Sequence, residues 1–186
     1  MKRTKLAIFD MDGTLFDTSE VNYRAYAEAA ESLGYKIERK KFLEVFVGKN
    51  YREFLPLFGI IKDEELAEIH QRKKETYINY LQYAKMNEQL FHVIHCIRSE
   101  YVIILATTAS RKNTEEILQC FGVSHLFDSI ITQEDTKKLK PNPECYLKAM
   151  EIAQIGSDNT IIFEDSDVGV TAGLASGAVV YRVHGF

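Results

Sequence analysis

The residues of this 186-residue chain best suited to chemistry are two carboxylates near its start, Asp10 and Asp12. They follow the apolar run 6–9, which is typical of a strand buried on both faces in a parallel sheet. Because side chains alternate along an extended chain, both carboxylates point the same way, about 7 Å apart along the strand. Like charges repel unless a cation or a proton lies between them. Ligands bind at this end of the strands in open α/β sheets, so the pair predicts a ligand site, with an acidic surface turn as the alternative.

A second acidic pair repeats this arrangement near the other end of the chain. Glu164 and Asp165 follow the apolar run 161–163. Either Ser166 or Asp167 is suited to cap the helix expected next, because short polar side chains accept hydrogen bonds from the first backbone N–H groups of a helix. Capping does not account for Glu164 and Asp165, which are therefore candidates for a functional role.

A lysine that is held rigidly before a helix is the third candidate. Pro141 disfavours the helical conformation for Lys140 and makes it extended. Asn142 is a good helix N-cap and Pro143 a good first helical residue. The Lys140 ammonium is thereby fixed where it could neutralise developing negative charge, with a solvated loop lysine as the alternative.

Two hydroxyls follow another apolar run. Thr107 and Thr108 come directly after the apolar residues 103–106. A hydroxyl at the end of a strand can donate a hydrogen bond to an oxyanion bound at the sheet edge. The alternative is a pair of β-branched strand residues followed by Ser110 as a helix cap.

The hydrophobic pattern divides the elements that must position these residues into two blocks. The first block shows helical periodicity and no strand pattern, with helices expected at 20–33, 39–47, 51–58 and 63–83. In the last of these, Tyr77 and Ile78 are expected to face inward. In the second block, from Asn87 onwards, helices are expected at 90–97, 111–121, 143–154 and 168–176, and strands at 101–107, 127–131, 160–163 and 178–183.

This alternation predicts an α/β fold with a doubly wound, parallel, Rossmann-like sheet. The strand at 6–9 belongs to the same sheet, so the helical block is an insertion. We expect one α/β domain at 1–15 and 85–186, and an all-helical domain at 16–84.

Composition indicates an ordinary globular protein, with 46% hydrophobic and 27% charged residues. The formal net charge of -4 offers no electrostatic reason to bind nucleic acid. The apolar run behind the basic start is only four residues long, too short for a signal peptide, and no stretch approaches a membrane span. The three cysteines form no Cys-x-x-Cys pair, which favours reduced thiols. We therefore expect a cytoplasmic monomer without nucleic-acid or membrane partners.

Four strings in this chain together resemble the motifs of the haloacid dehalogenase-like hydrolase superfamily. The strings are Asp-Met-Asp-Gly-Thr-Leu-Phe-Asp at 10–17, Thr-Ala-Ser at 108–110, Lys-Pro-Asn-Pro-Glu-Cys-Tyr at 140–146 and Glu-Asp-Ser-Asp-Val-Gly at 164–169. They occur in the family's order, and the resemblance covers essentially the whole chain. It is strongest to the β-phosphoglucomutase and phosphatase branch, whose helical cap is inserted after the first motif, as the 16–84 block is here.

The resemblance implies a Mg²⁺ site. Its protein ligands would be the Asp10 carboxylate, the Asp12 backbone carbonyl and the Asp165 carboxylate, with Glu164 binding either directly or through water. Oxygen ligands of this kind suit a hard divalent cation. A small phosphorylated metabolite is the implied partner.

The resemblance also implies catalytic roles. Asp10 would attack phosphorus and form an aspartyl-phosphate. Asp12 would protonate the leaving alkoxide and later deprotonate water. Thr108 and Lys140 would hold the transferring oxygens.

Substrate contacts are implied for several further positions. Gly48 and Lys73 in the cap, and Ser110 and Arg111 in the core, lie where that branch contacts its substrate. Arg52 falls near a phosphate-binding arginine of the family, but one residue out of step.

The leading hypothesis is a Mg²⁺-dependent phosphatase that acts on a small phosphate monoester, such as a sugar phosphate. A β-phosphoglucomutase-like mutase is the alternative, but the mutases carry a histidine in the first cap helix where this chain has Asn22, and Asn cannot carry a proton. Dehalogenation needs neither Asp12 nor the metal-binding acids. Phosphonate hydrolysis would need a cap lysine, with Lys49 or Lys73 as candidates. A non-catalytic binding protein on the same fold is the least favoured alternative.

Overall fold

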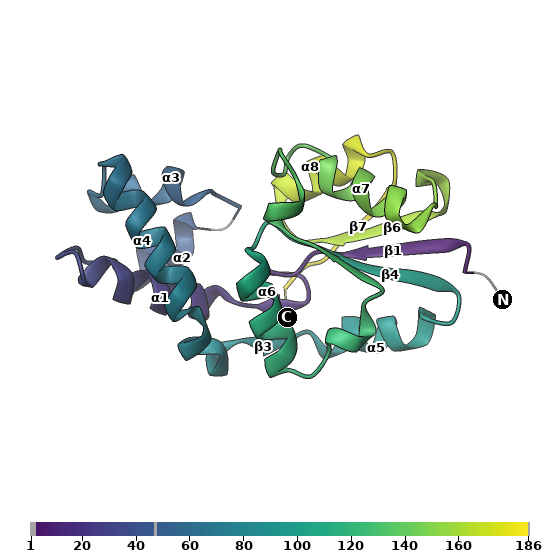
Figure 1. Ribbon diagram of the computed structural model, residues 1–186, viewed down its shortest axis with the longest axis horizontal. Helices are drawn as coiled ribbons and strands as arrows, with labels where there is room; N and C mark the ends of the chain where they lie inside the picture. The colour runs from purple at the N-terminus through teal and green to yellow at the C-terminus, as the bar shows by residue number, and fades with distance from the viewer. Residues whose placement is uncertain (1–2, 47, 186) are drawn as a thin grey trace. The chain divides into compact units, whose positions relative to one another are not determined.

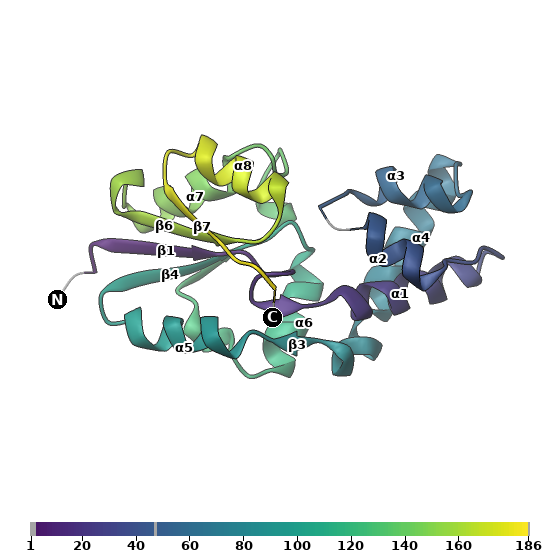
Figure 2. The same ribbon diagram turned by 180° about the vertical axis from the view of Figure 1, so that it is seen from behind.

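The computed structural model describes residues 3–46 and 48–185 and divides the chain into two compact units. The core unit comprises Met1–Asp17 and Lys85–Phe186, and the helical unit comprises Thr18–Ala84. Figures 1 and 2 show the elements of each unit from opposite sides. Among the described residues, no helix combines the length and the apolar character needed to cross a membrane. The assignment of the helical unit as a cap domain stays a prediction.

A five-stranded parallel sheet forms the centre of the core unit and confirms the predicted α/β fold. Phe9 pairs with Leu105 on one side and with Phe163 on the other. The residues that follow these three therefore lie at one level, at the carboxyl edge of the sheet. The strands are ordered β5-β4-β1-β6-β7, and their bounds are β1 (Lys5–Phe9), β4 (Tyr101–Ala106), β5 (Ser129–Ile131), β6 (Thr160–Glu164) and β7 (Val179–Arg182).

Helices cover both faces of this sheet (Figures 1 and 2). α5 (Glu88–Ile97) and α6 (Arg111–Cys120) lie on one face, and α7 (Glu144–Ala153) and α8 (Asp167–Ala175) lie on the other. Because both faces are covered, the strands are apolar on both sides. The short 3-10 helices of this unit are η3 (Ser124–Leu126), η4 (Gln133–Asp135) and η5 (Ser157–Asn159). One buried cluster contains Leu6, Ile8, Ile104, Ala106, Ile131, Tyr146, Ala149, Ile162 and Ala172.

Side-chain caps set the starts of the two helices nearest the expected site. Ser166 caps α8, because its hydroxyl accepts a hydrogen bond of 3.1 Å from a backbone N–H in the first turn, and this selects Ser166 over Asp167. α7 begins at Glu144, one residue later than predicted, with Pro143 at the N-cap position. Asn142 still contributes, since its side-chain oxygen accepts a hydrogen bond of 3.1 Å from the Glu144 N–H.

One short strand, β2, contradicts the prediction that 16–84 holds no strand, and its partner β3 lies just beyond that block. β2 (Phe16–Asp17) and β3 (Lys85–Met86) pair antiparallel where the chain leaves and re-enters the core unit. Two residues are too few to show the alternating pattern of a strand, and their pairing depends on a partner far away in the sequence. β5 likewise begins at Ser129 instead of residue 127, because a 3-10 turn precedes it.

The helical unit contains four α-helices and two 3-10 segments among its described residues. Their bounds are α1 (Ser19–Glu31), α2 (Arg39–Val45), α3 (Tyr51–Phe54), η1 (Leu55–Phe58), α4 (Asp63–Thr76) and η2 (Tyr77–Tyr83). An aromatic-rich buried cluster holds them together, with Tyr26, Ala30, Ile37, Phe42, Phe54, Leu55, Ile60, Leu66 and Ile69 among its members.

Three helix predictions in this unit need correction. The helix predicted at 51–58 changes to 3-10 geometry at Leu55. α2 ends at Val45, and Val47, the predicted last residue, lies outside the described residues. The predicted helix 63–83 changes to 3-10 geometry at Tyr77. A 3-10 helix turns 120° per residue, where an α-helix turns 100°, so the inward face shifts. Tyr77 is buried as expected, but Ile78 is 51% exposed.

Candidate active site

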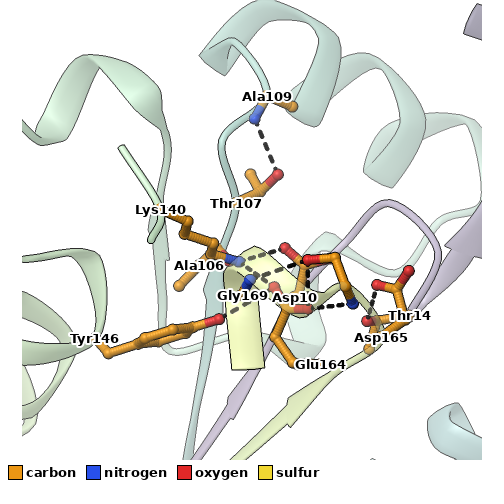
Figure 3. A network of polar contacts seen from close by, with 11 residues as sticks. Asp10, Thr14, Ala106, Thr107, Ala109, Lys140, Tyr146, Glu164, Asp165 and Gly169 are labelled. Atoms are coloured by element: carbon orange, nitrogen blue, oxygen red, sulfur yellow. Dashed lines mark hydrogen bonds and ion pairs between the residues drawn. The ribbon is translucent and has the colours of Figure 1, made fainter. Parts of the chain in front are cut away.

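Three carboxylates from the two acidic pairs meet at the carboxyl edge of the sheet. Carboxylate oxygens of Asp10, Glu164 and Asp165 lie within 4.8 Å of one another, as Figure 3 shows. The reason is the strand order: β1 and β6 are neighbours, and the Asp10 N–H donates a 3.0 Å hydrogen bond to the Phe163 carbonyl. Asp10 and Glu164 are buried, and Asp165 is half-buried.

Lys140 reaches this cluster from the loop before α7. Its ammonium donates to Asp10 Oδ1 at 2.6 Å, to Glu164 Oε1 at 2.7 Å and to the Ala106 carbonyl at 3.2 Å. A lysine ammonium has three donors, so each one has an acceptor. The Lys140 side chain is only 3% exposed, and a charge this deeply buried is tolerated because it is paired and fully hydrogen-bonded.

Burial and mutual repulsion shape the electrostatics of the cluster. Burial raises the pKa of Asp10 well above its usual range; the Lys140 charge opposes this shift, and the charges of Glu164 and Asp165 add to it. Burial and the Glu164 charge likewise raise the pKa of Asp165 to about 6. Burial acts to lower the pKa of Lys140, but Asp10 and Glu164 outweigh it and hold that pKa well above its usual range. Three carboxylates thus face one ammonium, and the site favours an additional cation.

Two glycines make room for the acids. A β-carbon at Gly13 would lie 2.2 Å from Asp165 Oδ2, and the backbone φ of +88° is a conformation that other residues rarely adopt. A β-carbon at Gly169 would lie 1.7 Å from Glu164 Oε1. Both acids therefore contact backbone that only glycine provides, which limits where their carboxylates can lie.

Hydroxyl and backbone donors orient the same two acids (Figure 3). The Thr14 hydroxyl donates to Asp165 Oδ1 at 2.9 Å, and the buried Tyr146 hydroxyl donates to Glu164 Oε1 at 3.2 Å. Ser166 donates to Glu164 Oε2 from its N–H at 2.9 Å and from its hydroxyl at 3.1 Å. Sequence reasoning gave Thr14 and Tyr146 no role, because no local pattern reveals which buried hydroxyl meets a carboxylate 151 or 18 positions away.

Asp12 and Thr108, the two other predicted catalytic residues, follow the carboxyl ends of β1 and β4 in the sequence. Asp12 is half-buried and its backbone bridges to Phe16. Among the described residues, the cluster of three carboxylates close enough to share a metal ion does not include Asp12. Thr108 is exposed just beyond β4, and the preceding Thr107 hydroxyl accepts a 3.0 Å hydrogen bond from the Ala109 N–H.

Two predicted substrate residues of the core unit have structural partners. Ser110 is buried and caps α6, where its hydroxyl accepts a 3.3 Å hydrogen bond from the Asn113 N–H. Arg111 forms ion pairs with Asp135 and, at 3.7 Å, with Glu115. Their predicted contact with substrate stays a prediction.

The remaining predicted substrate residues belong to the helical unit. Gly48 is exposed, and Arg52 forms a 2.6 Å ion pair with Asp63. Lys73 is buried, with its ammonium 4.5 Å from the centre of the Tyr77 ring. The roles of these residues in substrate binding stay predictions as well.

Asn22, which the motif resemblance places where the mutases carry a histidine, is buried in the helical unit. Its side-chain amide donates to the Thr18 carbonyl and to the Thr18 hydroxyl, both at 3.0 Å. Its amide therefore closes the first turn of α1.

Comparisons with known proteins identify the family and several relatives of this chain. Residues 7–183 match the family described as haloacid dehalogenase-like hydrolase. The phosphorylated carbohydrates phosphatase of Thermotoga maritima is 30% identical over 185 residues, which cover 96% of this chain and 83% of that protein.

Two solved structures share the fold. CbbY from Rhodobacter sphaeroides, in complex with phosphate, has a TM-score of 0.86 at 24% identity and covers 98% of this chain and 87% of its own. The β-phosphoglucomutase from Clostridium difficile has a TM-score of 0.80 at 22% identity, with 97% and 84% covered. The resemblance found in the sequence motifs and the expectation of a hydrolytic enzyme are confirmed by the family match: the chain belongs to the haloacid dehalogenase-like hydrolase family.

Proposed function

We propose that the protein is a Mg²⁺-dependent phosphatase that hydrolyses a small phosphate monoester through an aspartyl-phosphate on Asp10. The observation that carries this proposal is the convergence of three carboxylates and the Lys140 ammonium at one sheet edge. The 30% identity to a phosphorylated carbohydrates phosphatase supports a sugar phosphate as the substrate class.

The acidic cluster fits a hard divalent cation. Asp10 and Asp165 offer carboxylate oxygens, the Asp12 carbonyl is the proposed backbone ligand, and Glu164 would bind directly or through water. Mg²⁺ prefers oxygen ligands of this kind. Burial raises the pKa values of Asp10 and Asp165, and the neighbouring carboxylate charges add to both shifts. When bound, the ion supplies positive charge that lets an anionic phosphate approach these carboxylates.

The chemistry divides between the two acids of the first motif. Asp10 attacks phosphorus as the nucleophile, and the bond to the leaving oxygen breaks while Asp12 donates a proton to that oxygen. Asp12, now a carboxylate, then takes a proton from a water molecule that attacks the same phosphorus. This second step releases inorganic phosphate and restores both carboxyl groups to their starting states.

Lys140 has two tasks in this scheme. Its bond to Asp10 Oδ1 holds the nucleophile in place, and its positive charge offsets the charge that develops on the transferring oxygens. The Thr108 hydroxyl, exposed beyond β4, is the proposed partner of a phosphoryl oxygen.

The test is a panel of sugar phosphates and other small phosphate esters, assayed for phosphate release with Mg²⁺ and with excess chelator. We expect release from at least one ester with Mg²⁺ and none with chelator. Asp10→Asn, which keeps the size of the side chain, is the matched control and should be inactive on the same ester. Release that persists in chelator, or in Asp10→Asn within tenfold of the unchanged protein, would contradict the proposal.

A mutase of the β-phosphoglucomutase kind is the second candidate, supported by the resemblance to that branch. Asn22 argues against it, because its amide cannot transfer a proton and is engaged by Thr18. Hydrolysis of the phospho-enzyme is therefore favoured over transfer to a second sugar phosphate.

A further inference from the structure

Thr14 connects the metal-site acids to the rest of the core unit. Its side chain is fully buried, and Figure 3 shows it pointing at Asp165. The hydroxyl donates to Asp165 Oδ1 at 2.9 Å, and the Thr14 carbonyl accepts a 3.1 Å hydrogen bond from the side-chain amide of Asn87. Two successive hydrogen bonds thus lead from Asn87 to a carboxylate of the cluster.

Asn87 lies directly after β3, where the chain returns from the helical unit to the core unit. It is buried, and its N–H donates to the Leu15 carbonyl at 2.9 Å. Its side-chain oxygen accepts a 3.2 Å hydrogen bond from the Leu90 N–H and caps α5. One side chain therefore joins the start of α5 to the loop that carries Thr14.

Asp165 has little freedom to respond if this loop moves. Its carboxylate lies against Gly13, where even one added carbon would come within 2.2 Å of Oδ2. The position of the Thr14 hydroxyl follows its backbone, which Asn87 holds through the Thr14 carbonyl. Because these groups are buried, loss of either hydrogen bond leaves a polar group without a partner.

We propose that Thr14 and Asn87 are positioning residues for the metal ligand Asp165, so that the returning linker and the metal site form one hydrogen-bonded unit. This proposal rests on the proposed function, because it takes Asp165 as a metal ligand. Neither residue needs to touch metal or substrate: they act by fixing the orientation of a carboxylate that does. Partners of this kind typically change metal affinity 10- to 100-fold when they are removed.

The first test measures the affinity of the protein for Mn²⁺, by electron paramagnetic resonance of the unbound ion and without substrate. Mn²⁺ serves as the probe because it prefers the same oxygen ligands as Mg²⁺. We expect Thr14→Val, which keeps the shape and removes the hydroxyl, to weaken binding about 10-fold. Thr14→Ser restores the hydroxyl and should bind as the unchanged protein does.

Asn87→Asp separates positioning from helix capping. Its oxygen can still cap α5, but the donor to the Thr14 carbonyl is lost, so Mn²⁺ binding should again weaken about 10-fold. Thr160→Val is the matched control for losing a buried hydroxyl, since Thr160 lies at the opposite end of β6 and donates to Gly156 at 2.8 Å. It should leave the affinity unchanged. Folded Thr14→Val and Asn87→Asp proteins that bind Mn²⁺ within twofold of the unchanged protein would overturn the proposal.

A second measurement uses the unchanged protein, so it does not depend on how the variants fold. The proposal implies that opening of the Asn87–Leu15 hydrogen bond releases Asp165. Because coupling between two sites is reciprocal, a metal ion bound at Asp165 must then oppose that opening. Amide hydrogen exchange is measured by mass spectrometry with and without Mg²⁺, which takes the place of the Mn²⁺ used in the first test. At 100 times the dissociation constant, exchange of the Asn87 amide should slow by up to about 100-fold, while the Glu100 amide, in the turn after α5, stays unchanged. An Asn87 amide that exchanges at the same rate with and without Mg²⁺ would contradict the coupling.

The outcomes distinguish this proposal from the proposed function. A protein that binds Mn²⁺ through this hydrogen-bonded unit but hydrolyses no phosphate ester retains the positioning role and loses the phosphatase assignment. A protein that is a Mg²⁺-dependent phosphatase, but whose affinity for Mn²⁺ is unchanged by the Thr14 and Asn87 substitutions, retains the phosphatase assignment and loses the positioning role. A protein that binds neither ion refutes both.

Discussion

Glu164 lies so close to the backbone of Gly169 that the first turn of α8 leaves no room for a side chain there. A β-carbon would lie 1.7 Å from Glu164 Oε1 and 1.9 Å from its carboxyl carbon. Glu164 is itself buried and bonded to Lys140, Tyr146 and Ser166, so it has no alternative position that keeps these contacts.

Gly169→Ala should therefore displace Glu164 and damage the site and the fold together. We expect a loss of about 1–3 kcal/mol in the free energy of unfolding, as for overpacked cores, and a fall in kcat/KM for phosphate release. Gly156→Ala is the matched control, because nothing lies within 4 Å of the position its β-carbon would take. Urea denaturation and initial rates check both quantities. Equal behaviour of the two variants would show that Glu164 adapts.

Lys140→Met should reduce turnover by about 100-fold or more. The change keeps the length of the side chain but removes the charge that holds Asp10 and faces the transferring oxygens, and one such group is worth about 10²–10³ in kcat. Lys140→Arg should not rescue activity, because the planar guanidinium cannot reproduce three bonds from one compact ammonium. Lys138→Met, in the exposed part of the same loop, is the control and should remain active. Full activity in Lys140→Met would remove this residue from the mechanism.

The helical unit should lose stability in acid because of His70. Burial, together with the charges of Lys74, Lys73 and Arg52, lowers the pKa of His70 from 6.5 to about 3. Between these two pH values the unfolded chain binds a proton that the folded chain does not, so the free energy of unfolding falls as pH drops from about 6.5 towards 3, and above 6.5 the effect is absent.

Urea midpoints at pH 7.5 and pH 5 test this effect. His70→Phe can keep the ring stacked on Tyr51, whose centre lies 4.0 Å away, and should show a smaller drop between the two pH values. His125→Gln, at an exposed histidine, should retain the full drop. An equal drop in His70→Phe and the unchanged protein would show that other groups cause the acid sensitivity.

Hydrolysis should outrun isomerisation. The protein is incubated with β-glucose 1-phosphate, Mg²⁺ and a bisphosphate primer, and inorganic phosphate and glucose 6-phosphate are followed together. Because Asn22 cannot act as an acid or an ionic switch, water should reach the phospho-enzyme as soon as it forms. Rapid isomerisation with little phosphate released would instead identify a mutase.

The sequence was sufficient for the α/β fold and for the approach of Asp10 to Glu164 and Asp165. Apolar runs and their turn residues are local signals, and parallel strands bring their carboxyl ends to one edge whatever their order. Contacts between distant residues carry no such signal. The Thr14–Asp165 bond spans 151 positions, and it exists only because β1 and β6 are neighbours in this register.

Short or irregular segments could not be predicted from the local sequence pattern either. β2 and β3 are two residues each, too short for an alternation to be visible. Ile78 follows the expected helical period, yet the change to 3-10 geometry at Tyr77 turns its side chain to solvent.

The most direct test of the account is chemical trapping of the phospho-enzyme at Asp10. The protein is mixed with a substrate found in the ester panel and with Mg²⁺, quenched in acid and reduced with borohydride, which converts an aspartyl-phosphate to homoserine. Asp10→Asn, which lacks the proposed nucleophile, is the negative control. The account predicts that peptide mass spectrometry finds the reduced residue at position 10 alone. Phosphate release with no modification at position 10, under conditions that trap an acyl phosphate, would contradict it.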